Sequence, residues 1–193
     1  MTDFTDPYIE TFSGERFYID DLAETSSINI IDIAHALSNI CRFTGHCSRF
    51  YSVAEHSYLA SYMAPKGYEL HALMHDASEA YICDIAKPFK SRLDNYEEIE
   101  SSIMKRIGVK FGLPLNFENH PIVKDIDVAL LMYEAKRLVP SGGKGWVEDS
   151  LIKVDAEELL KEVSVGVSIG KGPNMAELLF LNRFKSLVEN QED

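Results

Sequence analysis

Long apolar runs and a secretory leader are both missing from this sequence of 193 residues. A transmembrane helix needs about 20 consecutive apolar residues, and no segment approaches that length. The N-terminus carries Asp3, Asp6 and Glu10, whereas a signal peptide has a basic and then an apolar region. We therefore expect a cytoplasmic protein with no membrane partner.

Cysteine and basic residues are also scarce. The three cysteines, Cys41, Cys47 and Cys83, are an odd number, which favours free thiols in a reducing compartment over a disulfide framework. The chain has 19 Lys and Arg against 31 Asp and Glu, and its formal net charge is -12. This charge disfavours binding to nucleic acid polymers. A small phosphorylated ligand is still compatible with it, provided that a metal or local cations offset the charge.

The length and composition are those of one folded domain over residues 1–193, with no low-complexity tract and no internal repeat. Aromatic and β-branched residues around Ser13-Gly14, within residues 8–19, predict a short hairpin or extended arm. Most of the remaining chain shows apolar residues at helical spacing. The predicted helices cover residues 29–38, 52–63, 70–81, 99–107, 121–133, 155–163 and 174–188. The expected fold class is all-α, a helical bundle with a small N-terminal β hairpin.

Several helix ends have local signals. Ser52 and Glu55 form a capping box, in which the serine oxygen accepts from the third helical amide and the glutamate reaches back to the cap. Pro65 and Gly67 end that helix, and Pro121 fits the first turn of a later one. These signals predict helix boundaries but no function.

A histidine-aspartate pair lies on the predicted helix over residues 70–81. A step of about 100° per residue places His75, Asp76 and Glu79 within about a third of the helix circumference, opposite the apolar stripe. An ordinary solvated helix face also carries polar residues, so the pair alone leaves both interpretations open. Ala72 and Ala80 keep the polar side small, which leaves room for a ligand.

The run Met74-His75-Asp76-Ala77-Ser78-Glu79-Ala80, followed by Asp84 and Lys87-Pro88-Phe89-Lys90, resembles the HD-domain phosphohydrolases, notably their deoxynucleotidase-like branch. The resemblance covers about residues 32–138 and implies an HD-domain helical bundle. It also implies that a metal is held by His56, His75, Asp76 and Asp127. Asp125 is a rival for the last position, but Asp127 matches the family pattern and lies on the same helical face as Glu134.

Two imidazoles and two carboxylates suit a divalent ion such as zinc, manganese, cobalt or iron, and magnesium could accompany the substrate phosphates. A metal-bound water has its pKa lowered to about 7 and supplies hydroxide at neutral pH. The resemblance implies that Glu79 is the general acid or base, with orientation of His75 as the alternative. Asp84 would assist proton transfer or bind a sugar hydroxyl, and a loop cap is its alternative.

Substrate contacts are expected from four further residues. By the same resemblance Arg42 would hold phosphate or sugar and Phe43 would pack on the base, although some relatives have tryptophan at the second position. Lys87 and Lys90 would bind phosphate, with ordinary surface lysines as the alternative. We expect Trp146 to anchor the core or a lid.

The run Arg42-Phe43-Thr44-Gly45-His46 resembles the corresponding run of deoxyadenosine triphosphate triphosphohydrolases. The resemblance therefore implies a metal-dependent phosphohydrolase that converts dATP, or another deoxynucleoside triphosphate, to deoxynucleoside and triphosphate. A 5'-deoxynucleotidase acting on monophosphates is the first alternative, because it shares the metal site. A non-catalytic nucleotide-binding HD module is the second, and other phosphoesters stay open within the same fold. Similar proteins assemble as dimers or larger rings, so we expect a homo-oligomer.

Overall fold

Most of the protein is helical in the computed structural model, which describes residues 7–19, 27–161 and 169–189. The longer helices are α1 (Ile30–Asn39), α2 (Val53–Met63), α6 (Tyr96–Phe111), α7 (Pro121–Leu138) and α9 (Pro173–Glu189). The shorter ones are α3 (Glu69–Met74), α4 (Glu79–Ile82), α5 (Lys87–Lys90) and α8 (Ala156–Lys161). Single 3-10 turns are η1 (Phe43–Gly45), η2 (Phe117–Asn119) and η3 (Asp149–Leu151). The predicted mainly helical class is confirmed.

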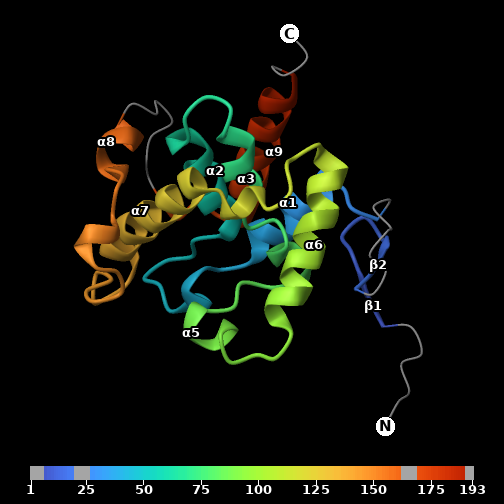
Figure 1. The fold of residues 1–193 in the computed structure, drawn as a ribbon, viewed down its shortest axis with the longest axis horizontal. Helices are drawn as coiled ribbons and strands as arrows, with labels where there is room; N and C mark the ends of the chain where they lie inside the picture. Colours follow the sequence, from blue (N-terminus) through green and yellow to red (C-terminus); the bar gives the residue numbers. More distant parts are fainter. Residues whose placement is uncertain (1–6, 20–26, 162–168, 190–193) are drawn as a thin grey trace.

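The predicted N-terminal hairpin is also confirmed. Strand β1 (Tyr8–Glu10) pairs antiparallel with β2 (Arg16–Tyr18). Gly14 in the turn has a φ of 84°, a conformation that favours glycine. Figure 1 shows the hairpin at one end of the molecule, with α7 and α8 at the other. Asp32 of α1 fastens the turn, since its carboxylate accepts from the Ser13 amide and from the Ser13 hydroxyl, both at 2.7 Å.

Helix α2 is central, because α1, α3, α7, α8 and α9 all contact it. Nearly all of its residues are buried, so it lacks the solvated face of a surface helix. Its polar side chains are therefore expected to find partners inside the protein. Ser61, for example, donates to the Tyr58 carbonyl at 2.7 Å and accepts from Arg183 Nε at 3.1 Å.

The predicted start of α2 is correct, but only half of the capping box forms. Ser52 Oγ accepts from the Glu55 amide at 3.1 Å, as expected. The Glu55 carboxylate does not reach back to the cap. It accepts instead from the amides of Gly170 and Lys171, at 3.0 and 2.8 Å. Glu55 thereby ties the segment before α9 to α2.

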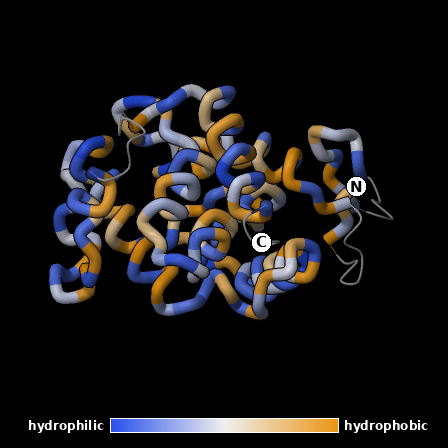
Figure 2. The backbone as a smooth tube through the Cα atoms, turned by 90° about the horizontal axis from the view of Figure 1, so that it is seen from above, coloured by the Kyte–Doolittle hydropathy of each residue, from blue (hydrophilic) through white to orange (hydrophobic). Residues whose placement is uncertain are grey.

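Two apolar clusters form the core, and both include residues of α2. One joins α1, α3, α6 and α9 through residues such as Ile33, Leu73, Ile107 and Phe180. The other joins α2, α7 and α8 through Leu59, Leu130, Leu138 and Leu160. Figure 2 shows apolar and polar residues interspersed along the backbone of the protein. Each such side chain stabilises the fold by about 1.5–3 kcal/mol when buried.

The structure also bears on the predicted start of α7, the extent of α8 and the state of the cysteines. Pro121 is the first residue of α7, and His120 caps this helix by accepting from the Ile122 amide at 3.3 Å. Helix α8 realises the predicted helix over residues 155–163, of which 162 and 163 lie outside the described residues. The three cysteines are free thiols, as expected. Among the helices described, none is long and apolar enough to cross a membrane.

Candidate metal centre

The four predicted metal ligands face one another where α2, α3 and α7 meet. His56 belongs to α2, His75 and Asp76 directly follow α3, and Asp127 belongs to α7. His56 Nε2 lies 3.2 Å from His75 Nε2 and 3.2 Å from Asp127 Oδ1. Asp76 Oδ2 lies 3.2 Å from His75 Nε2 and 3.7 Å from His56 Nε2. His56, His75 and Asp76 form a group that could hold a metal ion, and Asp127 adds a second carboxylate beside it.

The spacing of these atoms suits ligands that share one ion. Ligands held about 2.1 Å from an ion lie about 3.0 Å apart at a right angle and about 3.4 Å apart at a tetrahedral angle. The separations between nitrogen and oxygen atoms across the group are 3.2 to 3.8 Å. Two imidazoles and two carboxylates also match the donor set of a borderline divalent ion. The side chains present therefore fit a metal.

The local backbone differs from the continuous helix predicted over residues 70–81, and that prediction is wrong. Helix α3 ends at Met74 and α4 begins at Glu79. Between them the amides of Ala77 and Glu79 donate to carbonyls three residues earlier, both at 3.0 Å. This tightening shifts the register of the turn that carries the His-Asp pair.

The segment that carries the His-Asp pair is also buried, whereas an ordinary surface helix would expose its polar face to solvent. His75 and Glu79 are 6% and 4% exposed, and the apolar Met74 and Ala77 on the other side are fully buried. Polar groups buried on this scale need specific partners. The His-Asp segment is thus an interior element and not a surface helix.

Both histidines have their outer ring nitrogen engaged. His75 Nδ1 lies 2.7 Å from the Ala72 carbonyl oxygen, and His56 Nδ1 lies 2.6 Å from Glu134 Oε1. A carbonyl oxygen can only accept, so His75 Nδ1 must carry the hydrogen. In a neutral ring this leaves the lone pair on Nε2, the atom that faces the other ligands.

The charges of the group are strongly coupled. Burial lowers the pKa of His75, but Asp76 and Asp127 outweigh it and raise that pKa to about 10. Burial raises the pKa of Asp76, but the nearby His75 and His56 outweigh burial and lower that pKa. A metal ion bound here takes the place of a proton, which is the usual coupling of metal affinity to pH.

Glu134 of α7 is a member of the site that sequence reasoning did not identify. Its side chain is fully buried. Tyr51 Oη donates to Glu134 Oε1 at 2.6 Å, and Arg42 Nε donates to Glu134 Oε2 at 3.2 Å. The available signal was its position seven residues after Asp127, on the same face of one helix. Tyr51, also fully buried, had no such signal.

Arg42 lies inside the site and not on its rim. Its side chain is largely buried, and Nη1 lies 3.7 Å from Asp76 Oδ2. The guanidinium carbon lies 5.6 Å from the centre of the Phe43 ring. Burial lowers the pKa of Arg42, but Glu134 and Asp76 outweigh it and raise that pKa. Arg42 therefore keeps its charge next to the metal ligands.

Phe43 forms a partly exposed aromatic pair with Trp146. The ring centres are 5.9 Å apart and the planes are tilted by 39°. Trp146 is 48% exposed, so its predicted role as a core anchor is wrong, and its role as a lid anchor stays a prediction. Phe43 and Thr44 have φ angles of 57° and 54°, which are strained for residues with side chains. Such strain is most often kept at functional sites.

Glu79 lies beside the metal ligands with one oxygen unused. Glu79 Oε1 is 3.5 Å from Lys90 Nζ, whereas Oε2 is buried and has no hydrogen-bond partner among the described residues. Burial, followed by repulsion from Asp76 and Asp84, raises the pKa of Glu79 well above its ordinary value. Burial likewise raises the pKa of Asp84. Both carboxyls are thus biased towards holding a proton.

The two predicted phosphate lysines differ in their surroundings. Lys87, at the start of α5, is exposed. Lys90 is partly buried and lies 2.9 Å from Glu100 as well as 3.5 Å from Glu79. The structure therefore brings Lys90 to Glu79 and leaves Lys87 at the surface.

The two candidate aspartates of α7 point to different neighbours. Asp125 Oδ1 pairs with Lys153 Nζ at 2.9 Å, while Asp127 Oδ1 lies 3.2 Å from His56 Nε2. Residues two apart on a helix point about 200° apart. Only Asp127 of this pair reaches the two histidines.

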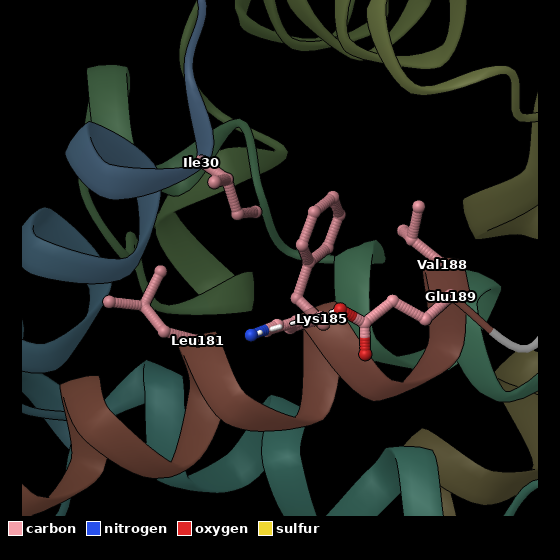
Figure 3. Close-up of a pocket in the computed structure, with 6 residues that line it drawn as sticks. Ile30, Leu181, Lys185, Val188 and Glu189 are labelled. Atoms are coloured by element: carbon pink, nitrogen blue, oxygen red, sulfur yellow. Dashed lines mark ion pairs between the residues drawn. The ribbon is translucent and has the colours of Figure 1, made fainter.

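A separate hollow lies between the start of α1 and the end of α9, with a volume of about 410 Å³. Figure 3 shows five of its lining residues, the apolar Ile30, Leu181 and Val188 and the charged Lys185 and Glu189. None of its lining residues belongs to the candidate metal centre.

Two bacterial proteins resemble this chain along its sequence. The chain is 40% identical over 182 residues to the uncharacterized protein YfdR of Escherichia coli (strain K12), across 94% of this chain and 96% of YfdR. It is 34% identical over 114 residues to an uncharacterized protein of Rhodobacter capsulatus, across 53% of this chain and 57% of that protein. No protein-family model matches the chain. The names of these relatives assign no activity.

Proposed function

We propose that this chain, which belongs to the YfdR family, is an HD-domain phosphohydrolase that uses a divalent metal to cleave the 5' phosphate ester of a deoxynucleotide. The observation that carries the proposal is the group of donor atoms from His56, His75, Asp76 and Asp127, which face one another at 3.2 to 3.8 Å. The HD assignment itself rests on the resemblance of about residues 32–138 to that family.

The four ligand residues would hold the ion, and Nδ1 of each histidine is held by an outer partner. A bound divalent ion lowers the pKa of a coordinated water to about 7 and offsets phosphate charge. The protein would bind the ester with Arg42, whose guanidinium is already buried beside Asp76. Arginine suits this role because its fork of donors matches phosphate geometry.

Glu79 would handle the proton of the leaving group. Cleavage adds water to phosphorus and breaks the bond to the 5' oxygen, which must then gain a proton. A carboxyl whose pKa is raised by burial is suited to donate it. Glu79 has that raised pKa and a buried oxygen without a protein partner. Asp84 would assist this transfer or bind a sugar hydroxyl.

The leading substrate is dATP or another deoxynucleoside triphosphate, with triphosphate as the second product. One observation favours the alternative, a nucleotidase acting on monophosphates. Lys90 is paired with Glu79 and Glu100, so of the two predicted phosphate lysines only Lys87 extends into solvent for phosphates beyond the first.

The test is a product assay on protein loaded with manganese, cobalt or zinc and offered each deoxynucleoside mono- and triphosphate, with Asp76→Ala as the inactive control. Triphosphate release establishes the leading reaction. Inorganic phosphate released from monophosphates establishes the nucleotidase. Metal binding without any turnover would overturn both reactions in favour of another phosphoester or a binding module.

A further inference from the structure

Glu134 joins two parts of the site that the sequence gives no reason to connect. Its Oε1 receives Tyr51 Oη and His56 Nδ1, both at 2.6 Å. Its Oε2 receives Arg42 Nε at 3.2 Å. One carboxylate of α7 thus touches a metal-ligand histidine of α2 and the arginine that precedes η1.

We propose that Glu134 is a positioning residue that sets both the metal-binding form of His56 and the orientation of Arg42 towards the substrate phosphate. The inference rests on the proposed function and deepens it, because it assigns one residue to the coupling of metal binding with substrate binding.

Glu134 decides which ring nitrogen of His56 carries the hydrogen. An ionised carboxylate only accepts, so Glu134 requires a hydrogen on His56 Nδ1. The neutral ring then presents its Nε2 lone pair to His75, Asp76 and Asp127. His56 is fully buried, so water is no ready substitute for this acceptor. Carboxylate partners of this kind commonly orient metal-ligating histidines.

Glu134 also orients the guanidinium of Arg42. Glu134 Oε2 occupies Nε, on the inner edge of the guanidinium. Nη1 is directed towards the metal ligands, at 3.7 Å from Asp76 Oδ2. Nη1 is therefore presented on the side of the metal ligands, where it could reach a phosphate bound to the ion.

Replacing Glu134 by glutamine makes these two roles compete. Tyr51, His56 and Arg42 all donate to Glu134, whereas an amide has one accepting oxygen and one donating nitrogen. If the amide nitrogen faces His56, the ring must move its hydrogen to Nε2 and lose the metal-binding form. If it faces Arg42, two donors meet and Arg42 is displaced. Either arrangement damages one of the two functions.

If Glu134 were only a buried link between α2 and α7, Glu134→Gln would lower the stability of the protein. Metal affinity and KM would then stay unchanged. Glu55→Gln is the matched control, because Glu55 is also fully buried and its carboxylate contacts Gly170 and Lys171. Tyr51→Phe is the graded variant, because it removes one donor and leaves the carboxylate in place.

The experiment measures manganese affinity by calorimetry and KM for the substrate found in the product assay. It also measures the His56 tautomer by nitrogen NMR of the metal-free protein, at a pH high enough for the ring to be neutral. We expect Glu134→Gln to weaken manganese binding or raise KM by about 10- to 100-fold, as outer partners of metal ligands do. Tyr51→Phe should show a smaller shift in the same direction. Glu55→Gln should change neither quantity.

A folded Glu134→Gln protein with the manganese affinity, His56 tautomer and KM of the wild type would overturn the inference. Failure of the proposed function is distinct, since the wild-type protein itself would then lack manganese binding or turnover. The NMR measurement separates the two cases, because it reports the His56 tautomer without metal or substrate.

Discussion

Two fully buried carboxylates, one on α2 and one on α7, accept hydrogen bonds from different kinds of donor. Glu55, on α2, accepts from the backbone amides of Gly170 and Lys171. Glu134, on α7, accepts from the side chains of Tyr51, His56 and Arg42. The first arrangement ties one stretch of backbone to another, whereas the second fixes the direction of functional side chains.

The charge states of the two carboxyls follow from these partners. Burial raises the pKa of Glu55, and the amides and Lys171 offset only part of that effect. Burial also disfavours the charge of Glu134, but Arg42 and His56 outweigh it and lower its pKa. Equal burial therefore does not imply equal roles, because the nature of the donors decides whether a buried acid stays ionised.

The largest effect is expected from breaking the metal centre itself. Asp127→Asn removes a negative charge 3.2 Å from His56 Nε2. Loss of an outer partner of a metal ligand weakens metal binding about 10- to 100-fold, and we expect a larger loss here. Asp125→Asn is the matched control, since Asp125 pairs with Lys153. Calorimetric titration with manganese measures both. Equal losses in the two variants would contradict the assignment of Asp127.

The second-largest effect is expected at Glu55, whose contacts join two stretches of backbone. Glu55→Gln places an amide nitrogen against one of two backbone donors, and we expect the free energy of unfolding to fall by about 1–3 kcal/mol. Urea unfolding measures this loss. An unchanged unfolding free energy would show that the Gly170 and Lys171 contacts do not stabilise the fold.

A third buried acid, Asp32, gives a pH-dependent prediction. Burial opposes its ionisation, but hydrogen bonds from Ser13, Thr11 and Asn29 outweigh burial and lower its pKa. The lowered pKa means that Asp32 stabilises the hairpin fully above the ordinary value of 3.8, and that this contribution is lost as pH falls through the lower folded value.

Asp32→Asn should remove this acid dependence and cost about 1–2 kcal/mol at neutral pH. Hydrogen exchange of the Ser13 amide, which donates to Asp32 at 2.7 Å, measures the local opening. Slow exchange that persists in the variant at neutral pH would contradict the prediction.

The smallest effect concerns two serines of the α2 region. Ser52→Ala removes the N-cap acceptor of α2 and should lower the unfolding free energy by about 1 kcal/mol. Ser57 is equally buried, but its hydroxyl has no hydrogen-bond partner among the described residues. Ser57→Ala should therefore be neutral or stabilising. Thermal unfolding of both variants checks the contrast, which disappears if both lose stability equally.

The helices were largely predictable because their signals are local. Apolar spacing, the N-cap at Ser52 and the first-turn proline at Pro121 depend on residues within one or two turns. The break between α3 and α4 was not predictable in this way. His75 Nδ1 turns back to the Ala72 carbonyl, and such side-chain bonds compete with regular helix geometry.

The amino-acid sequence specifies which residue types are available for a metal site, and the family resemblance over about residues 32–138 selected His56, His75, Asp76 and Asp127 among them. The packing of α2, α3 and α7 brings these side chains together, turns Asp125 towards Lys153, and lets Glu134 contact both His56 and Arg42. Periodicity in the sequence specifies the face of a helix, whereas the partner of that face depends on how these three helices pack.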